Sequence, residues 1–185
     1  DVAAVTPDVL RSLHARIVGA SRAELAVAGD FDADAVKAAA VRALGGWPTA
    51  APYVRVPQPL VPPPPARLVF VTPDKQNAVM QAFLPIALKE GDDDYAAFMM
   101  ANYMLGSGGN SRLWKRIREK DGLSYDVYAY VAWNPYEAHS TWNAGAIFAP
   151  ANRAKVEAAF NEEVARALKD GFTATELAEG KAGLL

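Results

Sequence analysis

The most constraining feature of this sequence is the stretch from Leu105 to Tyr125, which passes from a glycine-rich loop through a basic helix into a strand. Three of the four residues at 106–109 are glycine, which adopts positive φ at little cost and lets another backbone approach closely. Asn110 or Ser111 is a suitable N-cap for a helix that follows. The loop is therefore either a tight turn or a contact site, and we expect a helix directly after it.

The predicted helix has one narrow apolar side and is otherwise basic. Its apolar residues form a stripe that we expect to be buried, and they are Leu113, Trp114 and Ile117. The remaining surface carries positive charges, at Arg112, Lys115, Arg116 and Arg118. Gly122 is suited to end the helix as its C′ residue, and residues 124–133 are then predicted to form a strand.

The order of residues in this stretch resembles the pitrilysin/insulinase family of zinc metallopeptidases, also called inverzincins. The shared pattern is L-G-x-G-x-x-S-R-L-x-x-x-I-R-E-K-x-G-L-x-Y, a far more specific signal than a lone glycine motif. In that family an Arg and a Tyr seven positions later, in a domain remote from the metal, help to hold the substrate at the zinc. The resemblance therefore implies a catalytic role for Arg118 and Tyr125, and a flexible, substrate-facing loop made of Gly106, Ser107, Gly108 and Gly109.

The side-chain chemistry of this pair fits that role but also allows simpler interpretations. Arg118 offers N–H donors to a peptide carbonyl or carboxylate, and Tyr125 offers a neutral phenolic donor to an oxygen that becomes negative. Alternatively, Arg118 is a solvated cation at a helix C-terminus and Tyr125 is a core aromatic residue beside Val127. For the glycine loop, the alternative is a phosphate cradle, although it lacks the Lys-Ser/Thr pair and the preceding strand.

The sequence contains no zinc-binding signature. The H-x-x-E-H helix motif of the family is absent, there is no Cys, and the two histidines, His14 and His139, are far apart in sequence. We therefore expect no metal ligand and no peptidase activity in this chain alone, and the resemblance implies that the zinc of the complete enzyme is bound elsewhere. The acidic run 92–94 is an alternative cation site, but its place at a predicted helix start explains it.

The resemblance covers nearly the whole chain and implies three parts. Residues 1–48 correspond to the tail of a preceding peptidase-family domain, and residues 66–185 to a C-terminal domain that is truncated at its end. Between them, residues 49–65 hold seven of the chain's 13 prolines, a composition typical of a semi-rigid polyproline II linker. A proline-rich ligand for an SH3-type module is the alternative for this segment. We expect the sequence to be part of a longer protein.

The pattern of helix and strand signals predicts an α+β fold, with a mixed or antiparallel sheet and helices packed on one face. Helices are expected after the N-caps Thr6 and Asp32, and over residues 94–105 and 150–170. Strands are expected over residues 24–30, 67–72, 79–88, 124–133 and 138–148, with an edge or bulge at Pro85 and a hairpin formed by the last two. Residues Thr173 to Glu176 form a capping box that begins a last helix.

The composition of the chain limits the kinds of molecule that it is expected to bind. The formal net charge of −2 gives no case for nucleic acid or an anionic membrane, and no apolar run is long enough to span a bilayer. The resemblance implies a peptide or protein substrate, a zinc-carrying partner domain or subunit, and a dimer. A catalytically inactive partner or scaffold subunit of the same family is the alternative. The frequent Ala, Pro and Arg fit a bacterial source, and a periplasmic location is a working hypothesis.

Overall fold

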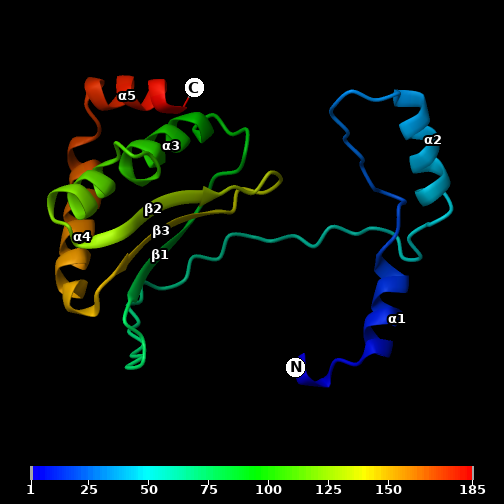
Figure 1. Cartoon of the computed structure of the whole chain (residues 1–185), viewed down its shortest axis with the longest axis horizontal. Helices are drawn as coiled ribbons and strands as arrows, with labels where there is room; N and C mark the ends of the chain where they lie inside the picture. Colours follow the sequence, from blue (N-terminus) through cyan, green and yellow to red (C-terminus); the bar gives the residue numbers. More distant parts are fainter. Residues whose placement is uncertain (1, 185) are drawn as a thin grey trace. The chain divides into compact units, whose positions relative to one another are not determined.

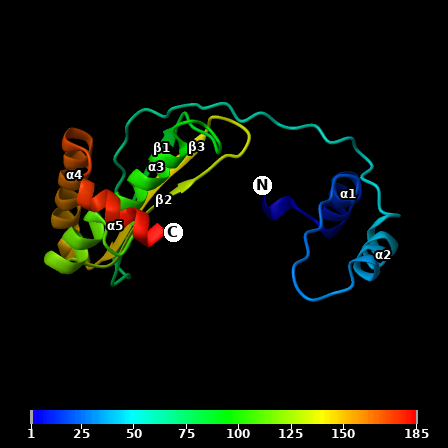
Figure 2. The same ribbon diagram turned by 90° about the horizontal axis from the view of Figure 1, so that it is seen from above.

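The computed structural model describes residues 2–184, and the chain divides into two compact units (Figures 1 and 2). Unit 1 is Asp1–Val56 and unit 2 is Pro57–Leu185, and each is described by itself. The division falls inside the proline-rich segment, where consecutive prolines favour extended chain over packed structure. The domain boundaries implied by the resemblance stay a prediction.

Unit 1 consists of helices joined by irregular chain. After a short 3₁₀ turn at Val2–Ala4 come α1 (Pro7–Ile17) and α2 (Ala33–Leu44). The predicted N-caps are confirmed, since the side chains of Thr6 and Asp32 accept hydrogen bonds from backbone N–H groups in the first turn of each helix.

The strand predicted over residues 24–30 is wrong, because these residues are irregular. A strand needs a neighbour to satisfy its backbone hydrogen bonds, and the described residues of unit 1 contain no other strand. The local apolar pattern was therefore not enough to form one.

Unit 2 is built on a three-stranded antiparallel sheet of β1 (Ala78–Ile86), β2 (Ser124–Ala132) and β3 (Ser140–Phe148). The strand order is β1-β3-β2, so β3 is central and β2 and β3 form the predicted hairpin. Pro85 lies in β1, at the edge of the sheet, where a missing N–H group is tolerated. The predicted α+β class is confirmed, with a purely antiparallel sheet.

The strand predicted over residues 67–72 is also wrong, because this segment pairs with no strand. Its apolar side chains are exposed, with Leu68 at 74% and Phe70 at 84%. The four prolines just before it lack the N–H groups that a ladder requires, so the chain approaches the segment in an unpaired, extended form.

The helices of unit 2 include two π-helical segments. They are α3 (Tyr95–Asn102), the π-helical segments Tyr103–Ser107 and Trp114–Lys120, a 3₁₀ turn at Pro150–Asn152, α4 (Arg153–Asp170) and α5 (Ala174–Leu184). The helix predicted over 94–105 therefore ends earlier as an α-helix, at Asn102, and continues as a π-helix that includes Gly106. Glycine favours the α-helix poorly, and π turns often lie at functional sites.

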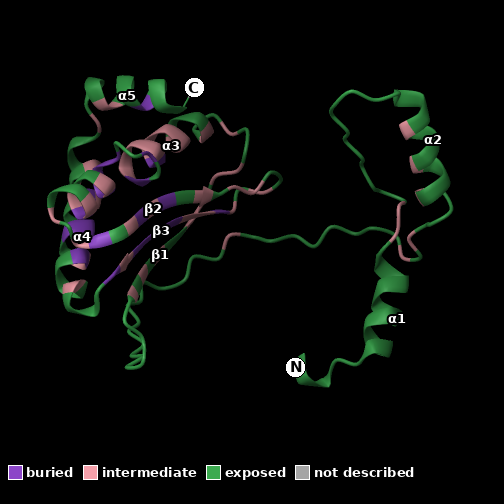
Figure 3. Cartoon of the chain, viewed as in Figure 1, coloured by how far each residue is buried: buried purple, intermediate pink, exposed green. Residues whose placement is uncertain are grey.

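The hydrophobic core lies between the helices and one face of the sheet, as Figure 3 shows by the burial of each residue. Its buried members come from both sides: Leu113, Ile117, Val127, Ala129, Ala144, Ala146, Phe148, Val156, Ala159 and Phe160. On the opposite face Val79, Phe83 and Tyr130 are at least half exposed. The prediction that helices cover one face is confirmed. Within residues 2–184, every helix is too short or too polar to cross a bilayer.

Candidate functional site

The structure brings Arg118 and Tyr125 together. Arg118 lies on the π-helical segment Trp114–Lys120, and the chain then turns at Gly122, whose φ of 59° confirms its predicted role in ending the helix. This reversal places Tyr125, at the start of β2, beside the helix it follows. The guanidinium carbon of Arg118 is 5.3 Å from the ring centroid of Tyr125, within the range of a cation–π contact.

Tyr125 occupies a β-bulge and is exposed. Ser124 is paired with Phe148 and Asp126 with Ile147, so Tyr125 is the extra residue with no partner in β3. The Ser124 hydroxyl lies 2.7 Å from the carbonyl oxygen of Asp126 and 2.6 Å from that of Ile147, which holds the bulge in place. A bulge re-aims the side chain it carries, and Tyr125 is 81% exposed.

This geometry corrects the expected strand alternation. Tyr125 does not share the buried face with Val127, which is only 4% exposed. The bulge breaks the period of two between them, because one extra residue interrupts the side-chain alternation. The interpretation of Tyr125 as a core aromatic residue is therefore excluded.

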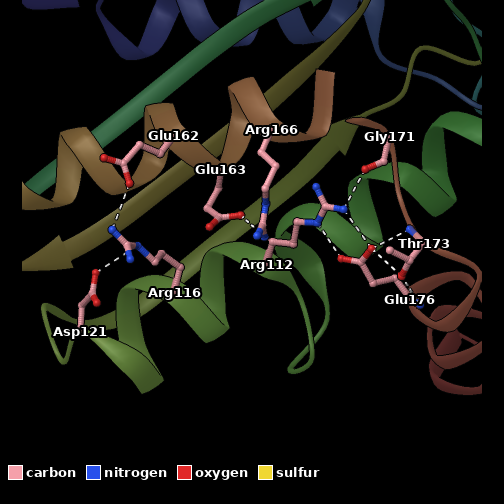
Figure 4. Close-up of polar contacts among 9 residues, drawn as sticks. All are labelled: Arg112, Arg116, Asp121, Glu162, Glu163, Arg166, Gly171, Thr173 and Glu176. Carbon is pink, nitrogen blue, oxygen red and sulfur yellow. Dashed lines mark hydrogen bonds and ion pairs between the residues drawn. The ribbon is translucent and has the colours of Figure 1, made fainter. Parts of the chain in front are cut away.

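Within residues 2–184, Arg118 differs from the other arginines of its helix in having no acidic partner. Arg112 forms a two-pronged pair with Glu176, at 2.6 and 2.9 Å, and Arg116 contacts Glu162 at 3.0 Å (Figure 4). In the described part of the chain, Arg118 has contacts with aromatic rings and neither an ion pair nor a side-chain hydrogen bond. Its N–H donors therefore remain available to a ligand, although the side chain is half-buried.

The glycine-rich loop packs against the strand that carries Tyr125. A Cβ on Gly106 would lie 2.6 Å from Cβ of Ala129 and 3.0 Å from Cδ1 of Leu113, so only glycine fits there. The Ser107 hydroxyl donates a hydrogen bond to the carbonyl of Ala129. Gly108 is also buried, and Gly109 is exposed.

No hydrogen bond or ring contact within residues 2–184 joins this loop to Arg118 or Tyr125. The structure thus assigns a packing role to Gly106 and Ser107. Their expected contact with substrate stays a prediction.

The described residues do not fit a zinc site. Among residues 2–184 there is no group of three or more His, Asp or Glu side chains that could hold a metal ion. His14 lies on α1 and stacks on Trp47, while Nδ1 of His139 is 2.9 Å from the carbonyl oxygen of Gln58 in unit 2. The two histidines thus have separate surroundings within different units.

A comparison with models of known protein families shows to which family this chain belongs. Residues 4–184 match the family model described as the peptidase M16 inactive domain. This chain belongs to the peptidase M16 family. The resemblance to the pitrilysin/insulinase family is thereby confirmed, and the M16 domain seen here is the one that the family model calls inactive. A search of curated proteins found no match.

Solved structures support the M16 fold. The peptidase M16 inactive domain from Pseudomonas fluorescens has a TM-score of 0.77 and 24% identity, over 98% of this chain and 43% of that one. A protease from Helicobacter pylori has a TM-score of 0.69 and 15% identity, over 99% and 44%. The periplasmic protease PqqL from Escherichia coli has a TM-score of 0.58 and 18% identity, over 84% and 17%. The M16 domain here thus spans less than half the length of each.

Arg112 is a buried arginine of the M16 domain that lies outside the candidate site. Its side chain is 8% exposed, and besides Glu176 its guanidinium donates to the carbonyl oxygen of Gly171 at 2.8 Å and lies over the ring of Phe172. The hydrogen bond from Arg112, opposed by desolvation and aided by Thr173, lowers the pKa of Glu176 to about 2. The same bond raises the pKa of Arg112. This pair fastens the start of the basic helix to the start of α5.

Sequence analysis missed one member of the site. Trp114 was assigned to the buried stripe, but it is only half-buried, and its ring centroid lies 4.2 Å from the guanidinium carbon of Arg118. The Trp114 ring is therefore closer to the Arg118 guanidinium than the Tyr125 ring is. A Trp four positions before an Arg on one helix was the available signal, since side chains at that spacing meet on a helix surface.

A cavity of about 170 Å³ borders the glycine-rich loop of the M16 domain but does not include the Arg118–Tyr125 pair. Its lining residues come from the loop, the preceding helix and α5: Tyr103, Met104, Gly109, Asn110, Ser111, Glu176, Glu179, Gly180 and Gly183. The Arg118–Tyr125 pair therefore lies outside this cavity, beside the bulge.

Proposed function

We propose that this M16 domain is the non-metal, substrate-binding part of a zinc metallopeptidase that hydrolyses peptides or small proteins. It supplies Arg118 and Tyr125 to an active site whose zinc is bound by another domain or subunit. The observation that carries the proposal is the pairing of an arginine that has no acidic partner in the described residues with a tyrosine that is 81% exposed on a bulge.

The two side chains offer complementary donors to a peptide. The planar guanidinium of Arg118 presents several N–H groups in a fork that fits a carbonyl or carboxylate oxygen. The phenol of Tyr125 donates one further hydrogen bond to an oxygen that gains negative charge during hydrolysis. They lie close enough to contact one extended peptide segment, in which successive residues are about 3.3 Å apart. Their role is to bind and orient the substrate.

The metal belongs outside this chain in the proposal, since the described residues hold no suitable ligand cluster. The M16 domain would therefore act with a zinc-carrying domain or subunit of the same family, in a dimeric arrangement. The glycine-rich loop at 106–109, which packs beside β2, would face the same substrate.

A second candidate function is that of a catalytically inactive partner or scaffold subunit. It is compatible with the match to a model of an inactive domain. In that case Arg118 and Tyr125 would hold a peptide or a partner segment without contributing to its cleavage.

Zinc content separates a peptidase that has its own metal domain from the other cases. We would measure zinc per chain in the full-length protein purified without other subunits. About one equivalent, as expected for a single catalytic metal, supports a peptidase with its own metal domain. Absence of zinc supports the scaffold role or dependence on a zinc-carrying partner subunit.

Tyr125→Phe then tests the proposed site in the active assembly. Loss of one positioned donor is expected to lower kcat/KM for an internally quenched peptide by about 10² to 10³-fold, with zinc content unchanged. Tyr130→Phe, on the same strand and half exposed, is the matched control and should leave turnover unaffected. Unchanged turnover in Tyr125→Phe would remove this phenol from the mechanism.

A further inference from the structure

Trp114 is the nearer of the two aromatic rings against the Arg118 guanidinium. The guanidinium carbon lies 4.2 Å from the centroid of Trp114 and 5.3 Å from that of Tyr125. Both distances are within about 6 Å, where a cation is attracted to a ring face, and Trp is the strongest of the aromatic partners. Trp114 and Arg118 also lie on the same π-helical segment, so their spacing is fixed by the backbone.

The two rings differ in how firmly they are held. Trp114 is half-buried on a helix whose neighbouring residues Leu113 and Ile117 are completely buried. Tyr125 is 81% exposed on a bulge. Trp114 is therefore the better fixed surface against which the long Arg118 side chain can be ordered before any ligand arrives.

Contact with a ring orders an arginine without using its hydrogen-bond donors. An acidic partner would also fix Arg118, but it would occupy the N–H groups, as Glu176 does for Arg112. An aromatic surface restricts the side chain and leaves these groups free. A group ordered in advance loses less conformational freedom on binding, which strengthens the complex.

We propose that Trp114 is a positioning residue: its indole ring holds the guanidinium of Arg118 beside Tyr125, with the N–H donors free for an oxygen of a bound peptide. This inference rests on the proposed function for the choice of a peptide as ligand. The contact between Trp114 and Arg118 can be tested without it.

The test compares Trp114→Phe, which keeps an aromatic ring, with Trp114→Leu, which keeps only apolar bulk. In the full-length protein, the NMR resonance of the Arg118 Nε–H group is expected to show a ring-current shift that Trp114→Phe largely retains and that Trp114→Leu reduces to the part contributed by Tyr125. Backbone spectra of both variants check that the fold is unchanged. An Arg118 resonance that is the same in the wild type and in Trp114→Leu would overturn the proposal.

Peptide binding is measured next, with a short fluorescent peptide as the probe. Trp114→Leu is expected to weaken binding about 3- to 30-fold, as the usual strength of a cation–π contact implies, and Trp114→Phe to restore most of it. In an Arg118→Ala background, Trp114→Leu should have no further effect. Tyr53→Ala, which removes a similar ring from Arg22 at 5.1 Å in unit 1, is the matched control.

The outcomes separate the two proposals. If Arg118→Ala leaves peptide binding unchanged, or the wild type does not bind the probe, the proposed peptide ligand is wrong, and the NMR shift alone decides the role of Trp114. If Arg118→Ala weakens binding but Trp114→Leu does not, the proposed function stands and the positioning role is rejected. The same rejection follows if the effect of Trp114→Leu persists in the Arg118→Ala background.

Discussion

Replacement of Glu176 by Gln tests the ion pair that fastens the basic helix to α5. The side chain of Glu176 is 24% exposed and that of Arg112 is 8% exposed, so the pair is shielded from solvent. Gln can replace Glu in the capping box with Thr173, whose backbone N–H donates to the Glu176 carboxylate at 2.7 Å. The substitution therefore removes mainly the negative charge that faces Arg112.

The expected cost follows from the pKa of Glu176, which the structure lowers from 4.5 to about 2. A difference of that size corresponds to about 3 kcal/mol of free energy of unfolding at neutral pH. Because the folded-state pKa is depressed, this contribution is complete above the unfolded-state value of 4.5 and is lost as the pH falls toward 2. At pH 3 about 1 kcal/mol should remain.

The assay is urea unfolding of wild type and Glu176→Gln at pH 7 and pH 3, with the free energy of unfolding taken from each transition. The matched control is Glu162→Gln, which breaks the contact of a 64% exposed carboxylate with Arg116. Exposed pairs contribute about 0–1 kcal/mol, so the control should lose far less than Glu176→Gln. An equal loss in the two variants, or a difference from wild type that does not shrink between pH 7 and pH 3, would refute the reasoning.

Two further predictions concern packing in unit 2. Gly106→Ala should lower the free energy of unfolding by about 1–3 kcal/mol, because the new Cβ would lie 2.6 Å from Cβ of Ala129. Gly109→Ala, whose Cβ would have no atom within 4 Å, should change the free energy of unfolding by less than about 0.5 kcal/mol. Thermal unfolding of both variants checks this. Leu113→Ala should lower the free energy of unfolding by about 2–5 kcal/mol, because Leu113 is completely buried. Leu168→Ala, at an 83% exposed position, should leave the free energy of unfolding in urea nearly unchanged. Similar losses in the two variants would contradict the assigned core.

Those parts of the fold that depend on local chemistry could be predicted from the sequence. The N-caps at Thr6 and Asp32 and the C′ glycine at Gly122 act within one helical turn, and each is found where it was expected. The hairpin of β2 and β3 also followed from two apolar strands that flank a short turn segment. In each case the interacting groups are close neighbours in the sequence.

Features that depend on distant partners could not be predicted. Residues 24–30 and 67–72 have strand-like composition, but a strand also needs a paired neighbour, and neither segment pairs with another strand among the described residues. The bulge at Tyr125 depends on its register against β3, which the sequence of β2 alone does not contain. The spacing of Arg118 and Tyr125 is visible in the sequence, but the exposure of Tyr125 is a finding of the structure.

The basic helix shows why residue type alone did not separate structural from functional arginines. Arg112 and Arg118 read alike in the sequence, as cations on a helix with a buried stripe. Arg112 is buried against Glu176, a residue 64 positions later, so its charge is neutralised inside the fold. Arg118 meets only ring faces in the described residues, which hold it without neutralising it. This difference in partners, rather than charge, makes Arg118 the candidate site residue in the proposed function.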